Sequence, residues 1–148
     1  MTRVLGVDLG ARRIGLALSD PLGVVAGPLT VLVRTGDRSA DHAAILRSAA
    51  ENEAAVVVVG VPWSLSTGRP GPAARAALDE VAELSARAAA LDPPVAVETA
   101  DERLTTVTAQ RSLATGGVRA RDRRAKVDMV AAAVMLQSWL DAHPRSGS

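Results

Sequence analysis

Short apolar runs separated by Gly, Pro and Asp residues divide the first third of the chain into strands. The first two runs, residues 3–10 and 13–20, are joined by a short connection that predicts a hairpin. A third run covers residues 24–34, and its Gly27-Pro28 pair indicates a bulge or an edge position. We therefore expect an antiparallel meander of three strands.

After residue 34 the pattern changes to alternating helices and strands. Four consecutive valines, Val56–Val59, are typical of a parallel strand that is buried on both faces. Apolar residues at helical spacing predict the helices between the strands. The expected elements are a helix at 39–51 with Ser39 as its cap, a strand at 54–62, a helix at 73–91, a strand at 93–100, and helices at 104–114 and 127–140.

The resulting order, β-β-β-α-β-α-β-α-α, predicts a single α/β domain over residues 1–141. We expect a five-stranded mixed sheet, with three antiparallel strands followed by two parallel ones and helices on both faces. Residues 118–126 are expected to form a basic loop, and residues 142–148 a disordered tail.

Composition excludes several kinds of site. The chain has 148 residues, no Cys, two His and two Trp as its only aromatic residues. Thiolate sites and multi-histidine metal sites are therefore excluded, and the scarcity of aromatic residues argues against base stacking as the main binding device. Neither a leader nor an apolar run of about 18 residues is evident, so we expect a soluble cytoplasmic protein. The net charge is only +1, so nucleic-acid binding would require local clusters of positive charge.

Four acidic residues are placed where chemistry could use them. Asp8 is near the end of an apolar strand, and Asp101 and Glu102 follow the last predicted strand. Asp128 shares a predicted helix face with small apolar residues. If the first and fifth strands run the same way, their carboxylates meet at the carboxyl edge of the sheet, where open α/β sheets bind ligands.

Each acid also has an ordinary structural explanation. Asp8 could cap the hairpin, Asp101 could cap the next helix, and Glu102 and Asp128 could each favour the dipole of a helix. Taken together, however, they form an oxygen-only donor set, which is the kind of site that Mg²⁺ or a similar hard cation such as Mn²⁺ prefers.

Basic residues gather beside these acids. Arg12 and Arg13 follow Asp8 in the hairpin connection, and a basic run precedes Asp128. A solvated charged surface is the common explanation for such residues, but their position next to a candidate metal site favours phosphate binding. The candidate nucleic-acid contacts are Arg12, Arg13, Arg103, Arg119, Arg121, Arg123, Arg124 and Lys126.

Four segments carry a family resemblance: GVDLGARRIGLALSD, VVVGVP, DERLTT and KVDMVAAAVMLQSWL. In order and spacing the chain resembles the YqgF family over residues 4–140, a family of candidate pre-16S rRNA nucleases also described as candidate Holliday junction resolvases. One departure is the segment WSLSTG, where the family usually has a polar loop containing Asn and Asp-Gly.

The resemblance implies an RNase H-like fold and metal-dependent phosphodiester cleavage. It maps the acidic triad onto Asp8, Glu102 and Asp128, with Asp101 as the second choice for the middle acid. Asp8 would bridge between the other two acids, which implies one or two Mg²⁺ or Mn²⁺ ions.

The alternatives remain open at the level of the sequence. The first segment also resembles the phosphate-binding hairpin of the actin, sugar kinase and Hsp70 group, but those proteins clamp ATP between two large domains. A non-catalytic nucleic-acid-binding factor in ribosome assembly is a second alternative. Structured precursor rRNA, a ribosomal precursor particle or branched DNA could be the partner, and the protein could be a monomer or a homodimer.

Overall fold

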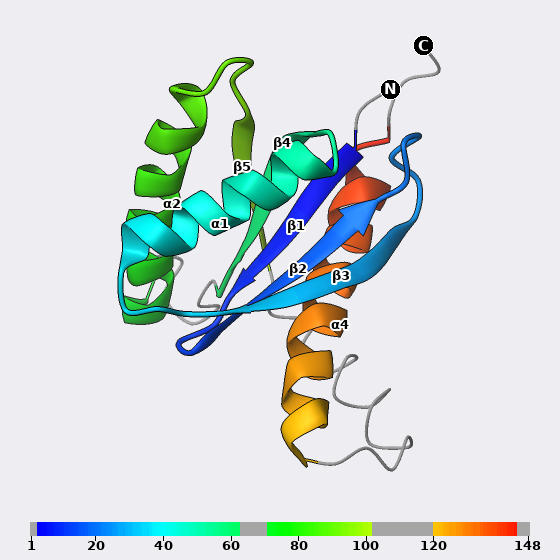
Figure 1. Cartoon of the computed structure of the whole chain (residues 1–148). Coiled ribbons are helices and arrows are strands. Elements are labelled where there is room, and N and C mark those ends of the chain that lie inside the picture. Colours follow the sequence, from blue (N-terminus) through cyan, green and yellow to red (C-terminus); the bar gives the residue numbers. More distant parts are fainter. Residues whose placement is uncertain (1–2, 63–70, 102–119, 145–148) are drawn as a thin grey trace.

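A computed structural model of the chain describes residues 3–62, 71–101 and 120–144, excluding the side chains of residues 120–125 (Figure 1). Strands and helices alternate in the predicted manner after an initial meander. The elements are β1 (Arg3–Leu9), β2 (Arg13–Ser19), β3 (Ala26–Val33), α1 (Arg38–Glu51), β4 (Ala54–Val61), α2 (Pro72–Ala89), β5 (Ala96–Asp101) and α4 (Ala120–Ala142).

The five strands form one mixed sheet in the order β3-β2-β1-β4-β5. Strands β1, β2 and β3 pair antiparallel, and β4 runs parallel to both β1 and β5. The predicted sheet is thus confirmed, and β1, which carries Asp8, is its central strand. The register of β2 and β3 shifts opposite Pro28, as the Gly27-Pro28 pair predicted for an edge strand.

Helices cover both faces of the sheet, as predicted (Figure 1). Leu5 and Val7 of β1 pack into a core with α1 and α2, while Val4 packs into a second core with α4. This alternation follows from the two-residue period of a strand. The buried members of both cores are Ala, Val, Leu, Ile and Met, in keeping with the composition.

Two predicted boundaries are wrong because nearby carboxylates cap the backbone. The cap of α1 is Asp37 rather than Ser39, since its Oδ1 accepts from the N–H groups of Ser39 and Ala40 at 2.9 and 3.4 Å. Strand β3 starts at Ala26 rather than at residue 24. The carboxylate of Asp20 instead holds the turn by accepting from two backbone N–H groups, and these bonds keep its pKa below the usual value.

The ends of β5 and α4 also differ from the predictions. Asp101 pairs with Val61 and is the last residue of β5, so it belongs to the strand and does not follow it. Helix α4 starts at Ala120, which makes most of the predicted basic loop helical. Ala, Arg and Lys are good helix formers, and no Gly or Pro interrupts the segment.

The predicted helix at 104–114 and the last four residues of the expected tail lie outside the described residues. Among the helices that the structure describes, none has the length and apolar character needed to cross a membrane.

Candidate functional site

The carboxyl ends of the parallel strands β1, β4 and β5 lie along one edge of the sheet. Asp8 lies near the end of β1, and the tight turn to β2 follows directly. The N–H of Gly10 donates to the carbonyl of Arg13 at 2.9 Å and closes this turn. A Cβ at Gly10 would collide with that carbonyl oxygen, so the turn requires glycine.

Asp8 and Asp128 come together through Gly15. Asp8 lies directly opposite Gly15 in the β1–β2 ladder, and a Cβ on Gly15 would collide with the backbone carbonyl oxygen of Asp128. Directly opposed residues of an antiparallel pair project to the same face. The side chain of Asp8 is therefore on the face covered by α4, beside the turn of α4 that carries Asp128.

Small residues let α4 approach the sheet this closely. A Cβ on Gly6 would lie 2.9 Å from the Cβ of Leu136 and 3.3 Å from the carbonyl oxygen of Ala132. Asp128, Ala132 and Leu136 follow one another at four-residue spacing and so form one stripe of the helix. The prediction that Asp128 shares its face with the buried Ala131, Ala132 and Met135 agrees with this packing.

The carboxylate of Asp128 pairs with a residue that we expected to contact nucleic acid. The Nε of Arg13 lies 2.7 Å from Oδ2 of Asp128, and the two side chains are 31% and 23% exposed. Sequence reasoning missed this pair. A signal was available, however, because Arg13 is two residues from Gly15 in β2 and therefore projects to the same face.

The structure does not place the other two predicted acids beside Asp8 and Asp128. Asp101 is exposed, and its neighbour Ala100 packs with the core under α4, so alternation places the side chain of Asp101 on the opposite face. Glu102 lies outside the described residues. Within the parts of the chain that the structure describes, no cluster of three or more His, Asp or Glu side chains could hold a metal ion.

The predicted basic residues are only partly described. Arg12 is exposed in the β1–β2 turn, and Lys126 is exposed two positions before Asp128. Arg103 and Arg119 lie outside the described residues, as do the side chains of Arg121, Arg123 and Arg124.

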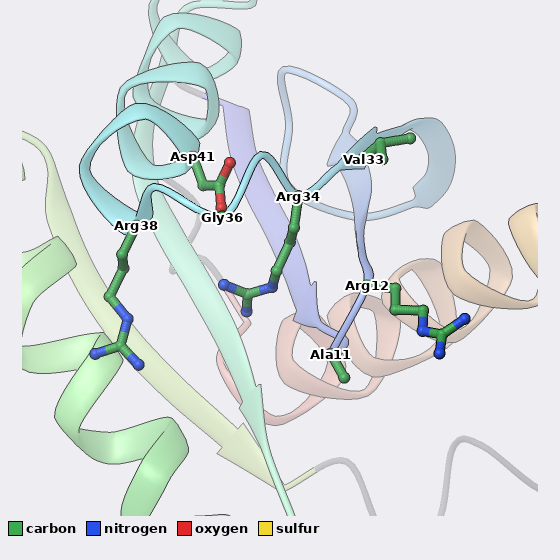
Figure 2. A pocket seen from close by; sticks show the side chains of 7 residues that line it. All are labelled: Ala11, Arg12, Val33, Arg34, Gly36, Arg38 and Asp41. Carbon is green, nitrogen blue, oxygen red and sulfur yellow. The ribbon is translucent and has the colours of Figure 1, made fainter.

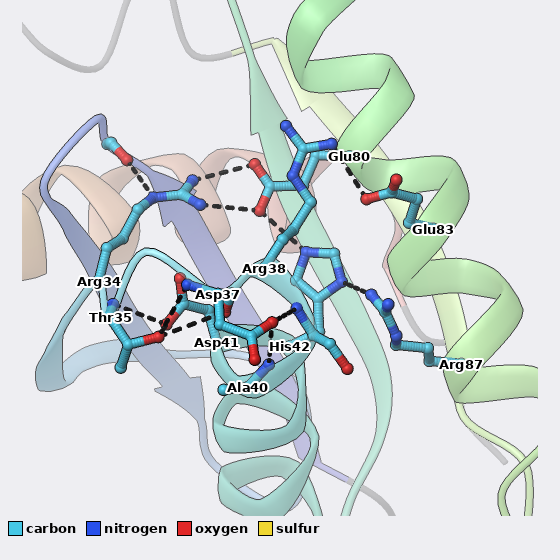
Figure 3. Close-up of polar contacts among 12 residues, drawn as sticks. Arg34, Thr35, Asp37, Arg38, Ala40, Asp41, His42, Glu80, Glu83 and Arg87 are labelled. Carbon is cyan, nitrogen blue, oxygen red and sulfur yellow. Dashed lines mark hydrogen bonds and ion pairs between the residues drawn. The ribbon is translucent and has the colours of Figure 1, made fainter.

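A second arginine holds the turn from the face that α1 and α2 cover (Figure 3). The Nε of Arg34 donates to the carbonyl of Gly10 at 2.7 Å. Its two terminal nitrogens donate to the carboxylate of Glu80 of α2, both at 3.0 Å. The hairpin next to Asp8 is therefore tied to α2 by a bidentate, charge-assisted contact.

Glu80 also contacts a fully buried histidine. Its Oε2 lies 2.8 Å from Nε2 of His42, whose Nδ1 lies 2.6 Å from a guanidinium nitrogen of Arg87. An arginine side chain can only donate hydrogen bonds, so Nδ1 of His42 must accept from Arg87. In a neutral imidazole the proton is then on Nε2, which donates to the carboxylate of Glu80. Burial raises the pKa of Glu80, but hydrogen bonds from Arg34 and His42 outweigh it and leave the pKa lowered.

Sequence reasoning also missed this network. Glu80 is four residues before Leu84 and next to Val81, on the apolar stripe of α2, and an acid at such a position was the available signal.

An arginine-lined cavity of about 410 Å³ opens beside the turn (Figure 2). Arg12, Arg34 and Arg38 line it together with a single acid. That acid, Asp41, is already engaged, because its Oδ1 accepts from the N–H and hydroxyl of Thr35. Arg34 and Arg38 also pair with Glu80 and Glu83 of α2, so acids balance two of the three positive charges.

Comparison with known proteins identifies a family and close relatives in sequence. The family model described as RuvX, Holliday junction resolvase, matches residues 2–142. A candidate pre-16S rRNA nuclease of Mycobacterium leprae (strain TN) is 49% identical over 140 residues, which cover 94% of this chain and 72% of the relative. The similarly named protein of Mycobacterium tuberculosis (strain ATCC 25177 / H37Ra) is 50% identical over 140 residues, covering 94% and 78%.

Solved structures support the same fold at low sequence identity. RuvC of T. thermophilus in complex with a Holliday junction substrate aligns with a TM-score of 0.56 and 17% identity, covering 97% of this chain and 96% of that one. The yeast mitochondrial Holliday junction resolvase Ydc2 aligns with a TM-score of 0.53 and 14% identity, covering 97% and 82%. These likenesses confirm the RNase H-like fold that the resemblance implied. Together with the family match and the relatives, they show that the chain belongs to the RuvX family.

Proposed function

We propose that this protein is a metal-dependent nuclease that hydrolyses phosphodiester bonds in the maturation of the 5′ end of precursor 16S rRNA. The observation that carries the proposal is the meeting of Asp8 and Asp128 at Gly15, in a chain about half identical to candidate pre-16S rRNA nucleases. This role places the protein in the cytoplasm, with residues 1–141 acting as one nuclease domain.

The residues at this edge fit a hard divalent cation. Asp8 and Asp128 supply carboxylate oxygens from one face of the sheet, and the buried His42 is on the other face. Asp8, Asp128 and Glu102 would hold Mg²⁺ or Mn²⁺ there. Asp101 is the weaker candidate, because strand alternation directs it to the opposite face. When bound, such an ion activates water and stabilises the charge of the leaving oxygen.

Positive charge beside the acids would hold the substrate. Arg12 is exposed at the turn and lines the neighbouring cavity. Backbone phosphates are recognised through such arginines without reading of the base sequence. Lys126 and the basic residues that precede it in α4 would extend this contact past Asp128. The bidentate pair of Arg34 and Glu80 would keep the turn in place while the substrate binds.

A nuclease assay with a matched control tests the proposal. Wild type, Asp8→Asn and Asp141→Asn are compared on precursor 16S rRNA and on a four-way DNA junction, with Mg²⁺ or Mn²⁺. Asp141 is an exposed acid near the far end of α4, about 20 Å along the helix from Asp128. Wild type and Asp141→Asn should cleave the rRNA, and Asp8→Asn should not.

Three outcomes would change the assignment. If Asp8→Asn cleaved the rRNA at the rate of wild type, Asp8 would not be a residue of the active site. Preferential cleavage of the junction would support the alternative function as a Holliday junction resolvase, which the description of the matching family favours. We would then expect a dimer, because resolving a junction requires two cuts. Binding of rRNA without cleavage under either ion would support a non-catalytic role in ribosome assembly.

A further inference from the structure

The ion pair between Arg13 and Asp128 bears on how a divalent metal ion would bind at the site. Asp128 is an acid that the proposed function assigns to the metal, yet its Oδ2 accepts from the Nε of Arg13 at 2.7 Å. This arginine is not an incidental surface neighbour. It starts β2 immediately after the turn, and its carbonyl accepts from Gly10 within that turn.

The fold fixes both partners independently of their contact. Gly15 holds the backbone of Asp128 against β2, and the ladder between β2 and β3, in which Arg13 pairs with Val33, sets the position of Arg13. A half-buried carboxylate next to another acid is costly unless a cation compensates its charge. The guanidinium of Arg13 supplies that positive charge from within the chain.

We propose that Arg13 is a built-in counter-ion that competes with the divalent metal for Asp128 and is displaced from it when the metal binds. The inference rests on the proposed function, because it takes Asp128 as a metal ligand. A guanidinium and a divalent ion are attracted to the same carboxylate and repel each other, and in a half-buried site this repulsion is only partly screened. Binding of one must therefore weaken binding of the other, and by the same factor in both directions.

Arg12 provides a matched control for this competition. It is the adjacent residue and carries the same charge, but its side chain is exposed in the turn, whereas that of Arg13 contacts Asp128. Removing its charge changes the general electrostatics of the edge without removing a competitor for the carboxylate of Asp128.

Calorimetric titration of the full chain with Mg²⁺ and Mn²⁺ tests the exchange. Arg13→Gln should bind the ion at least about fivefold more tightly than wild type. A change of this size is within the usual range of coupling between two sites. Arg12→Gln should change the affinity by no more than about twofold, because salt screens an exposed charge. Equal or weaker affinity in Arg13→Gln would overturn the inference.

A measurement on wild type removes any dependence on how the variant folds. In ¹⁵N-labelled protein, the Nε–H of Arg13, assigned by its absence in Arg13→Gln, should exchange slowly with solvent before Mg²⁺ is added. It should exchange faster at saturation with Mg²⁺. An Nε–H that stays protected while the metal binds would contradict displacement.

The two proposals fail in different ways. If wild type cleaves rRNA with Mg²⁺ but Arg13→Gln keeps the wild-type metal affinity, the exchange is wrong and the nuclease assignment stands. If neither wild type nor Arg13→Gln binds either ion, both the exchange and the metal dependence are wrong.

Discussion

Gly15 of β2 lies against the backbone carbonyl of Asp128, although the two residues are far apart in the sequence. No residue with a Cβ fits there without displacing α4, because the atom that it would meet is backbone. The same glycine lies opposite Asp8 in the sheet. Close packing at this one position therefore determines whether the two acids meet.

Replacement of Gly15 tests this packing. Gly15→Ala should lower the free energy of unfolding by about 1–3 kcal/mol or more, the usual cost of overpacking a core, because α4 must move away from β2. Gly27→Ala is the control, since nothing lies within 4 Å of a Cβ built there. Urea unfolding of both variants measures the difference. A Gly15→Ala protein as stable as Gly27→Ala would show that α4 is not held at this distance.

Two arginine–glutamate pairs join the segment after β3 to α2, and they should differ in strength. Arg34–Glu80 is bidentate with side chains 19% and 6% exposed, whereas both members of Arg38–Glu83 are 47% exposed. Arg34→Met should cost about 3–5 kcal/mol, because it removes the charged partner of a buried carboxylate and leaves Glu80 with only the contact to His42. Arg38→Met should cost about 1 kcal/mol or less.

Double-mutant cycles with Glu80→Gln and Glu83→Gln isolate each interaction from other effects of the substitutions. Equal coupling energies in the two cycles would mean that burial of Glu80 adds nothing to its pairing.

The lowered pKa of Glu80 gives a pH dependence with a definite sign. A carboxylate whose pKa is lower in the folded state stabilises the fold above its unfolded value, near 4.5, and loses that contribution as pH falls through the folded value. Wild type should therefore lose stability on acidification below about pH 4.5, and Glu80→Gln should lose less over the same range. Thermal unfolding across this range measures both slopes. If the stability of wild type and of Glu80→Gln falls in parallel as the pH is lowered, Glu80 does not contribute to the acid sensitivity.

Loss of both acids that we propose as metal ligands should be no worse than loss of one. Asp8→Asn and Asp128→Asn should each abolish cleavage, and the double variant should be no slower, because groups that act as a unit have non-additive effects. Single-turnover cleavage of precursor rRNA measures all three. Multiplicative losses would indicate that the two acids serve separate steps.

Salt dependence tests the basic segment before Asp128. If Arg121 and Arg123 bind phosphates, replacing both with Gln should reduce the slope of log affinity against log salt by about 0.7–0.9 for each phosphate that is no longer neutralised. Filter binding of precursor rRNA to Asp8→Asn protein, with and without the two changes, measures this slope without cleavage. An unchanged slope would show that this part of α4 is an ordinary solvated surface.

Local patterns in the sequence were enough to predict the order of strands and helices and the mixed sheet that they form. That Asp8 and Asp128 belong to one site was implied by the family resemblance. Period-two alternation marks β1 and β2, and consecutive valines mark β4. Small residues after Asp128 mark a closely packed helix face.

The pairing of the polar groups, in contrast, emerged with the tertiary structure. Arg13 reaches Asp128 across 115 positions, Arg34 reaches Glu80 across 46, and His42 reaches Glu80 across 38. Such pairs depend on strand register and on the distance at which a helix packs, and neither is encoded in the residues next to a charged side chain. An arginine in a turn looks the same in sequence whether it faces solvent, a phosphate or a carboxylate. The packing of α4 and α2 onto opposite faces of the sheet made that choice for Arg13 and Arg34.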